Sequence, residues 1–339
     1  MTWLVGQKLH DGRYAIEREL GRGYFSITYL VSDRDRKRLV IKTLSDDLLG
    51  QLNSSEIDLI QEQFLQEAVR LAKCKHPHIV QIKEPFLEDN QVCILMEYVD
   101  GVDLATRARE RLPEAEALRY IQQIGEALKV VHANGLVHRY VKPENILVRN
   151  SKDEAVLIDF GLARGADHPL SSLDANTGDG FDAIELYHHV DGKLGDYTDI
   201  YSLAGTLYFL LTGVVPPTAM ERSQGRERLT APKQINPEIS DRTNEAILTG
   251  MALAGEDRPQ TIQDWLDILG VQRQVSRSRQ SGNSIAWLVV IGALLAVLGS
   301  MAAWFIFKPP QSPKPTDNPK SQLIQPRGDF LVNKLPESR

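Results

Sequence analysis

The feature that most constrains this chain is a run of 23 residues, Ile285–Phe307, that contains no charged side chain. As a helix it would be about 34 Å long, enough to cross the roughly 30 Å hydrocarbon core of a bilayer. Trp287 and Trp304 fall near its two ends, where amphipathic rings favour the membrane interface. The length and isolation of the run argue against a buried helix of a water-soluble domain. We therefore expect one transmembrane helix, with the main globular domain before it.

The segments around this span differ in composition. Residues 308–339 contain seven prolines, and so short and proline-broken a tail cannot bury a core. We expect this tail to be disordered and to lie outside the cell. Residues 270–284 are rich in Ser, Gln and Arg and are expected to form a basic linker. The rest of the chain is expected to comprise an N-terminal extension, residues 1–13, and a globular domain, residues 14–269.

Charge and cysteine usage narrow the class of protein. The chain has 339 residues with 39 basic and 45 acidic side chains, a net charge of −6. This balance argues against a general nucleic-acid-binding surface, which needs a basic excess. Cys74 and Cys93 lie in apolar stretches without metal-ligand spacing and are predicted to be buried, reduced thiols of a cytosolic domain. Residues 1–11 lack the pattern of a signal peptide.

Hydrophobic periodicity divides the globular part into two portions. Extended patterns come first, at residues 14–20, 27–31, 38–44 and 92–99, and are interrupted by a helical pattern at residues 62–73. Helical spacing dominates beyond Gly101, at residues 113–134, 197–211 and 241–253. The sequence therefore predicts an α+β fold in which a small sheet-rich lobe precedes a larger helical lobe.

Several short motifs lie on this framework, and each is weak by itself. Gly21-Arg-Gly-Tyr-Phe-Ser lies between two predicted strands, where glycines allow backbone amides to approach phosphate oxygens. A lone Gly-x-Gly is more often a plain hairpin turn. Lys42 ends the strand motif Val-Ile-Lys, and Glu67 lies on the predicted helix. Two longer runs follow, Val137-His-Arg-Tyr-Val-Lys-Pro-Glu-Asn-Ile-Leu-Val and Val156-Leu-Ile-Asp-Phe-Gly.

In this order and at this spacing, the motifs resemble those of the bacterial serine/threonine protein kinases of the eukaryotic (Hanks) type. The resemblance covers roughly residues 14–269. It implies a two-lobed protein-kinase fold that binds ATP and Mg²⁺. By the same resemblance, Lys42 should hold the α- and β-phosphates and pair with Glu67, Lys142 should approach the γ-phosphate, and Asn145 and Asp159 should carry Mg²⁺.

Further roles follow from the same resemblance. Met96 matches the gatekeeper, and Glu97 and Val99 match the backbone contacts to adenine. The wider ATP-binding set that it implies is Gly21, Gly23, Ser26, Thr28, Val40, Lys42, Glu67, Met96, Glu97, Val99 and Leu147. The regulatory or structural positions that it implies are His138, Arg139, Phe160, Gly161, Thr177, Glu185, Asp199 and Arg258. Of these, Asp199 should orient the His138-Arg139 turn, and Glu185 should pair with Arg258.

The chain departs from the family pattern at the catalytic base. The family has aspartate after His-Arg, and this chain has Tyr140. That aspartate accepts the proton of the substrate hydroxyl and aims the hydroxyl at phosphorus. A phenol is protonated at neutral pH, accepts a proton poorly, and is large enough to occupy the space that the acceptor needs. General-base catalysis contributes about 10²–10⁴-fold, so transfer should be strongly impaired.

Other departures support this interpretation. The family's Thr-x-Gly-Tyr is replaced by Gly178-Asp-Gly-Phe, so the threonine that would bond the missing aspartate is displaced to Thr177 or absent. Ile184 replaces the proline before Glu185. The nucleotide site changes less. Ser26, Thr28 and Val40 replace glycine, valine and alanine, and the added bulk of Val40 should weaken ATP binding without abolishing it.

We therefore expect a membrane-tethered pseudokinase, a nucleotide-binding scaffold or regulator of a partner kinase or effector. The alternative is a slow but genuine serine/threonine kinase that acts on a protein substrate. The globular domain should face the cytoplasm in a single-pass arrangement. The small residues Gly292, Ala296 and Ser300 recur every four positions and make a homodimer through this helix face possible.

Overall fold

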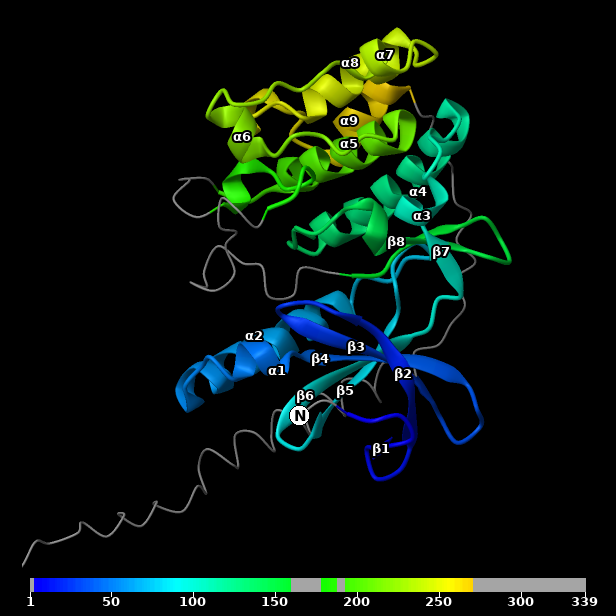
Figure 1. Ribbon diagram of the computed structural model, residues 1–339, viewed down its shortest axis with the longest axis vertical. Helices are drawn as coiled ribbons and strands as arrows, with labels where there is room; N and C mark the ends of the chain where they lie inside the picture. The colour runs from blue at the N-terminus through cyan, green and yellow to red at the C-terminus, as the bar shows by residue number, and fades with distance from the viewer. Residues whose placement is uncertain (1–2, 160–177, 188–192, 271–339) are drawn as a thin grey trace, which may run out of the picture. The chain divides into compact units, whose positions relative to one another are not determined.

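The structure, a computed structural model, describes residues 3–159, 178–187 and 193–270. Within these residues, six strands form an antiparallel sheet in the order β1-β2-β3-β4-β6-β5 (Figure 1). Its strands are β1 (Lys8–Leu9), β2 (Tyr14–Arg22), β3 (Ser26–Ser32), β4 (Arg38–Leu44), β5 (Ile82–Glu88) and β6 (Gln91–Glu97). β4 lies between β3 and β6 and is buried from Leu39 to Leu44. Its position brings Lys42 opposite Thr28 on one side and Ile94 on the other.

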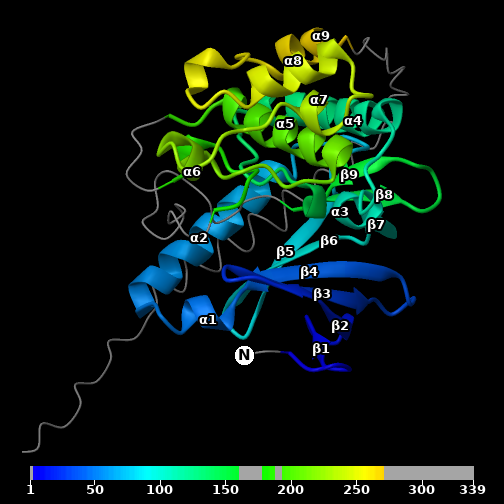
Figure 2. The same cartoon turned by 45° about the horizontal axis from the view of Figure 1, so that its top comes forward.

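Two helices join β4 to β5: α1 (Asp46–Leu49) and α2 (Ser54–Leu71). α2 packs against β5 and β6 (Figure 2). Sequence spacing predicts this helix from residue 62, but it begins two turns earlier. The reason is a capping box, in which the Asn53 side chain accepts from the Glu56 backbone N–H and the Glu56 carboxylate accepts from the Asn53 N–H.

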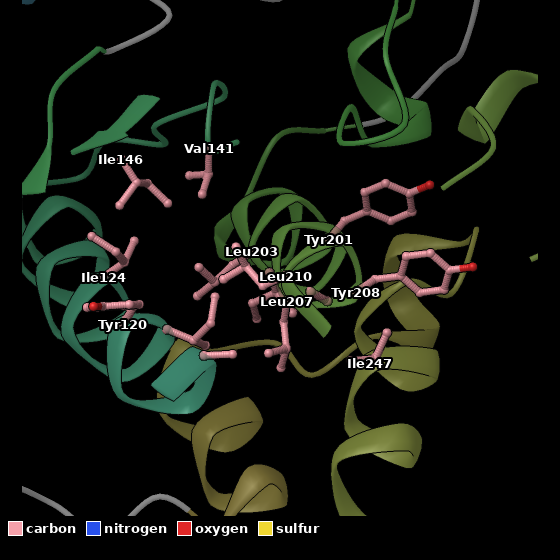
Figure 3. Packing of buried hydrophobic residues seen from close by; sticks show 14 of the residues in the cluster. Tyr120, Ile124, Val141, Ile146, Tyr201, Leu203, Leu207, Tyr208, Leu210 and Ile247 are labelled. Carbon is pink, nitrogen blue, oxygen red and sulfur yellow. The ribbon is translucent and has the colours of Figure 1, made fainter. Parts of the chain in front are cut away.

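The helical lobe is built around α4 (Glu114–Ala133) and α5 (Asp196–Thr212), which pack against each other and against α9 (Ile262–Leu269). Its remaining helices are α3 (Leu104–Arg107), α6 (Ala219–Ser223), α7 (Pro232–Ile235) and α8 (Asp241–Gly250). Buried side chains from α4, α5 and α8 meet between them, among them Tyr120, Leu207 and Ile247 (Figure 3). α5 is buried almost throughout, which fits its position at the centre of the lobe.

A second sheet connects the site to this lobe. Strands β7 (Gly101–Asp103), β8 (Ile146–Arg149) and β9 (Ala155–Leu157) pair in that order. The short helix η1 (Pro143–Asn145) leads directly into β8. Gly101 allows the close pairing of β7 with β8, because a Cβ at this position would overlap the Val148 carbonyl. The pairing of β7 with β8 thus fixes the C-terminal end of the loop that holds residues 138–145.

The α+β prediction and the two-lobed arrangement are confirmed. The predicted helices at 113–134, 197–211 and 241–253 correspond to α4, α5 and α8. Cys74 and Cys93 are buried free thiols. Each helix in the described part of the chain is too short or too polar to cross a membrane. The expected linker, membrane span and tail, residues 271–339, lie outside the described residues.

Candidate active site

A cavity of about 330 Å³ lies where the first sheet meets the loops of the helical lobe. Nine of the predicted nucleotide and metal residues line it: Gly21, Thr28, Val40, Lys42, Met96, Glu97, Val99, Leu147 and Asp159. Six residues that were not predicted as site residues also line it, namely Arg18, Leu20, Val80, Tyr98, Gly101 and Ile158. Of these, Leu20 and Ile158 immediately precede motif residues, so proximity to a motif was a usable signal. The walls of the cavity are mainly aliphatic, as a planar heterocyclic base requires.

Gly23 lies in the turn between β2 and β3, Ser26 begins β3, and neither residue lines the cavity. The backbone N–H of Gly23 donates to the carbonyl of Ser26 at 2.9 Å. The Tyr24 hydroxyl donates to Gln51 Oε1 at 3.0 Å, which ties the turn to the segment between α1 and α2. The turn therefore begins next to Gly21 in the cavity wall, and Tyr24 anchors the turn to Gln51.

Lys42 forms an ion pair with Asp159 at the inner end of the cavity. The Lys42 side chain is 7% exposed and that of Asp159 is 30% exposed. β4 supplies the lysine, and the segment after β9 supplies the aspartate. A nucleotide with its base between the aliphatic walls would direct its phosphates at this pair.

The expected pair between Lys42 and Glu67 is not formed, although the structure describes both residues. Glu67 Oε1 instead lies 2.6 Å from Arg139 Nη2, and both side chains are largely buried. Lys42 has Asp159 as its partner. The prediction of this pairing was wrong because the sequence offered Glu67 a second, bidentate-capable cation, and a guanidinium binds carboxylates more rigidly than an ammonium.

The predicted role of Asp199 is confirmed. Its carboxylate accepts from the backbone N–H groups of His138 and Arg139, each at 2.8 Å. Arg139 has φ of 67°, a left-handed conformation that is costly for a side chain with a Cβ. The two hydrogen bonds to a fully buried carboxylate hold that conformation. His132 Nε2 lies 2.7 Å from the same carboxylate.

Burial and charge shift the pKa values around this turn. Burial lowers the pKa of His138 to about 4, so its ring is neutral at pH 7. Burial alone would lower the pKa of His132, but the carboxylates of Asp199 and Asp196 outweigh it and raise that pKa. Burial would likewise raise the pKa of Asp199. The hydrogen bond from His132 and the interactions with His138 outweigh burial and lower that pKa. The buried carboxylate therefore stays ionised and continues to accept hydrogen bonds from the backbone N–H groups of His138 and Arg139.

The oxygen atoms near the phosphate end suit a magnesium ion. Asn145 is buried, and its side-chain amide donates to the Tyr140 carbonyl at 2.9 Å, which leaves its Oδ1 for a cation. Asp159 contributes a carboxylate. Mg²⁺ prefers oxygen ligands and is often held by one or two protein groups together with substrate phosphates. The described residues contain no cluster of three or more His, Cys, Asp or Glu that could hold a metal alone.

Lys142 lies between an aromatic ring and a carboxylate. Its Nζ is 4.7 Å from the centroid of the Tyr140 ring and 3.0 Å from Asp179 Oδ2. The Lys142 side chain is 19% exposed, and that of Asp179 is 32% exposed. Burial would lower the pKa of Lys142, but the Asp179 carboxylate outweighs it and raises that pKa. The ammonium is therefore held in place and partly neutralised.

The segment that carries Asp179 is fixed by its own hydrogen bonds. Asp179 Oδ1 accepts from the Phe181 N–H at 3.0 Å, and the Asp179 N–H donates to Asp182 Oδ2 at 2.9 Å. A Cβ at Gly178 would overlap the hydroxyl of Tyr187. The family's threonine could therefore not be accommodated at position 178 without movement of Tyr187. The sequence did not single out Asp179, because it falls at the variable position of the family's Thr-x-Gly-Tyr, here Gly178-Asp-Gly-Phe.

The predicted pair between Glu185 and Arg258 is confirmed. Arg258 Nη1 lies 2.8 Å from Glu185 Oε1, and Arg258 Nη2 lies 3.0 Å from Glu185 Oε2. Arg258 also donates to the carbonyls of Ala252, Leu253 and Tyr197. This network anchors residues 178–187 to the helical lobe. Three predicted positions, Phe160, Gly161 and Thr177, lie outside the described residues.

Comparison with known proteins now identifies the family. A family model described as the protein kinase domain matches residues 14–270, well over half of the chain. This chain belongs to the protein kinase family. A solved structure described as the apo form of PpkA-294 superposes with a TM-score of 0.65 at 26% identity, covering 79% of this chain and 99% of that one. The two-lobed kinase fold is thereby shown.

Bacterial serine/threonine-protein kinases are among the relatives of this chain. PknE of Mycobacterium bovis is 33% identical over 265 residues, covering 75% of this chain and 45% of that protein. A probable serine/threonine-protein kinase of Clostridium perfringens is 31% identical over 268 residues, covering 76% of this chain and 38% of that protein. The chain thus spans less than half the length of these relatives. Membership of the family implies ATP and Mg²⁺ as ligands in general.

Proposed function

We propose that this protein binds a nucleotide with Mg²⁺ but transfers phosphate poorly, and that it acts as a pseudokinase scaffold or regulator. The observation that carries the proposal is Tyr140, which stands where the family has its catalytic aspartate. The centroid of its ring lies 4.7 Å from Lys142 Nζ. Phosphoryl transfer depends mostly on positioning and electrostatic stabilisation, so a misplaced or excluded acceptor is costly.

Nucleotide binding is supported by the groups that remain. Lys42, Asn145 and Asp159 are present, and the aliphatic part of the cavity is open to a base. Lys42 and Asp159 must separate before phosphates and Mg²⁺ can bind. That exchange replaces one ion pair with two, lysine with phosphate and aspartate with Mg²⁺, so charge stays compensated.

The alternative is a slow serine/threonine kinase. The same retained groups favour it, since a loose transition state needs little proton transfer at its peak. Transfer measurements on Tyr140 variants separate the two functions.

The test uses the full-length chain, purified in detergent micelles. Mg²⁺ with ATP at a hundredfold excess over the dissociation constant should stabilise the protein by about 2.7 kcal/mol. Lys42→Ala should reduce this shift, because the phosphates lose a cation. Transfer of the γ-phosphate should be near background in the wild type and higher in Tyr140→Asp. Transfer by the wild type at ordinary kinase rates, about 1–100 s⁻¹, with loss in Lys42→Ala, would establish the alternative.

A silent Tyr140→Asp variant that still binds nucleotide would have a different meaning. It would place the defect in the acceptor side as well, at Gly178 and Ile184.

We also propose that residues 285–307 tether the protein to the membrane with the kinase-like domain in the cytoplasm. The proposal rests on the uncharged run, on the reduced thiols Cys74 and Cys93, and on the need for a cytosolic nucleotide. The charges flanking the run are nearly balanced and do not decide the orientation. Protease added to intact cells should leave the domain intact, and digestion would reverse the orientation.

We also propose that two copies of the chain associate through the helix face that carries Gly292, Ala296 and Ser300. Substituting isoleucine at all three positions should reduce the yield of cross-linked dimer, and an unchanged yield would exclude this face.

A further inference from the structure

Lys42, which lines the cavity, and Lys142, in the loop beside the segment that bears Asp159, are each paired with a carboxylate. Lys42 is paired with Asp159, and Lys142 with Asp179. The two pairs differ in whether Mg²⁺ bound with a nucleotide can replace the lysine as the partner of the carboxylate. Mg²⁺ can take over Asp159, which frees Lys42 for phosphate. Asp179 has no such exchange available, because it is tied to its own turn through the Phe181 N–H.

The position of Lys142 determines which phosphate group of a nucleotide would reach the Lys142–Asp179 pair. The carbonyl of Asn145 accepts from the Ile158 N–H at 3.0 Å, so the loop bearing Lys142 runs beside the segment bearing Asp159. A phosphate chain that passes Asp159 toward this loop therefore reaches the Lys142–Asp179 pair with its outermost group. That group would meet an ammonium already neutralised by one carboxylate and covered on another side by the Tyr140 ring.

We propose that this site selects nucleoside diphosphates over nucleoside triphosphates, and that Asp179 is the residue that sets this preference. The inference rests on the proposed nucleotide binding and specifies the ligand. A terminal phosphate that enters beside Asp179 meets a like charge at short range, and Lys142 cannot compensate both anions. A diphosphate ends at the Lys42–Asp159 pair and avoids this cost. The protein would then report or retain the diphosphate form of a nucleotide.

The experiment measures dissociation constants for ADP and for the β,γ-imido analogue of ATP, each with Mg²⁺, by calorimetry on the full-length chain in detergent. The imido bridge prevents slow transfer or hydrolysis from converting one ligand into the other. In the wild type we expect ADP to bind about tenfold more tightly than the triphosphate, the size of effect that one charge several ångströms away produces near a surface.

Asp179→Asn is the decisive variant, because the amide keeps an oxygen for the Phe181 N–H while the charge is removed. It should tighten triphosphate binding about tenfold relative to ADP and erase the preference. Lys142→Met should move the ratio the other way, since the Asp179 charge is then uncompensated. Asp241→Asn is the matched control, because the Asp241 side chain is 92% exposed on α8 and should leave the ratio unchanged.

Equal or tighter binding of the triphosphate by the wild type overturns the inference, as does an unchanged ratio in Asp179→Asn. If Asp179→Asn does not fold, Asp179→Ser decides, because it removes the same charge and its hydroxyl can also accept from the Phe181 N–H. Failure to bind either nucleotide is a different result, because it removes the proposed function itself.

Discussion

Arg139 Nη2 lies 2.6 Å from Glu67 Oε1, and this contact gives Arg139 the carboxylate that the family's motif order assigns to Lys42. Arg139 reaches α2 from a turn that Asp199 holds in a left-handed conformation. The loop that holds residues 138–145 and α2 are thereby joined by an ion pair that is largely shielded from water. Lys42 forms its ion pair with Asp159 instead.

The Arg139–Glu67 pair should contribute measurably to stability. Glu67→Gln should lower the free energy of unfolding by about 2 kcal/mol, between the values typical of exposed and of buried pairs, because it leaves Arg139 without its carboxylate. Urea denaturation without nucleotide measures this. Glu17→Gln is the control, since the Arg38–Glu17 pair is more exposed and should cost below about 0.5 kcal/mol. Similar losses in the two variants would contradict the prediction.

The Arg258–Glu185 network should be the costliest ion pair to break. Arg258→Ala should destabilise the protein by about 3–5 kcal/mol, because it leaves a buried carboxylate and three carbonyls without their donor. Chemical denaturation provides the value. Arg111→Ala should have little effect, as its contact with Glu238 is 3.9 Å long and exposed. A loss below about 1 kcal/mol for Arg258→Ala would show that the network contributes little.

Restoring the family's threonine should be harmful at position 178. Gly178→Thr should lower the free energy of unfolding by about 1–3 kcal/mol, because its Cβ overlaps the buried Tyr187 hydroxyl. Gly21→Thr is the matched control, since a Cβ there meets nothing within 4 Å. Thermal unfolding of both variants without nucleotide tests this, and equal melting temperatures would refute the steric argument.

Acid should destabilise the protein through His138. Its pKa is about 4 in the folded state and about 6.5 when unfolded, so the unfolded state binds the proton first. The contribution of neutral His138 is complete above about pH 6.5 and is lost as pH falls toward 4, at about 1.4 kcal/mol per pH unit. Denaturation curves at pH 6.5, 5.5 and 4.5 give the slope. His138→Gln should reduce that slope by about this amount, and an unchanged slope would assign the acid sensitivity elsewhere.

Periodicity and motif order were sufficient to predict the lobes, the strands that carry Lys42 and Met96, and the Asp199 and Glu185 contacts. The strands and helices follow from local periodicity, and the two contacts follow from the resemblance to the family. The start of α2 was missed, because the Asn53 cap adds polar helical turns that carry no hydrophobic pattern. The Lys42–Glu67 pairing failed for a different reason. Several charged groups meet there, and only their positions in space decide which cation takes which carboxylate.

The two ion pairs at the inner end of the cavity also bear on the design of chemical probes. The aliphatic walls formed by Leu20, Val40 and Leu147 can accept a flat, neutral heterocycle without disturbing either pair. A phosphate mimic must first separate Lys42 from Asp159, and a longer one must also face Asp179. Uncharged compounds confined to the base-binding end should therefore be better inhibitor scaffolds for this protein than anionic nucleotide analogues.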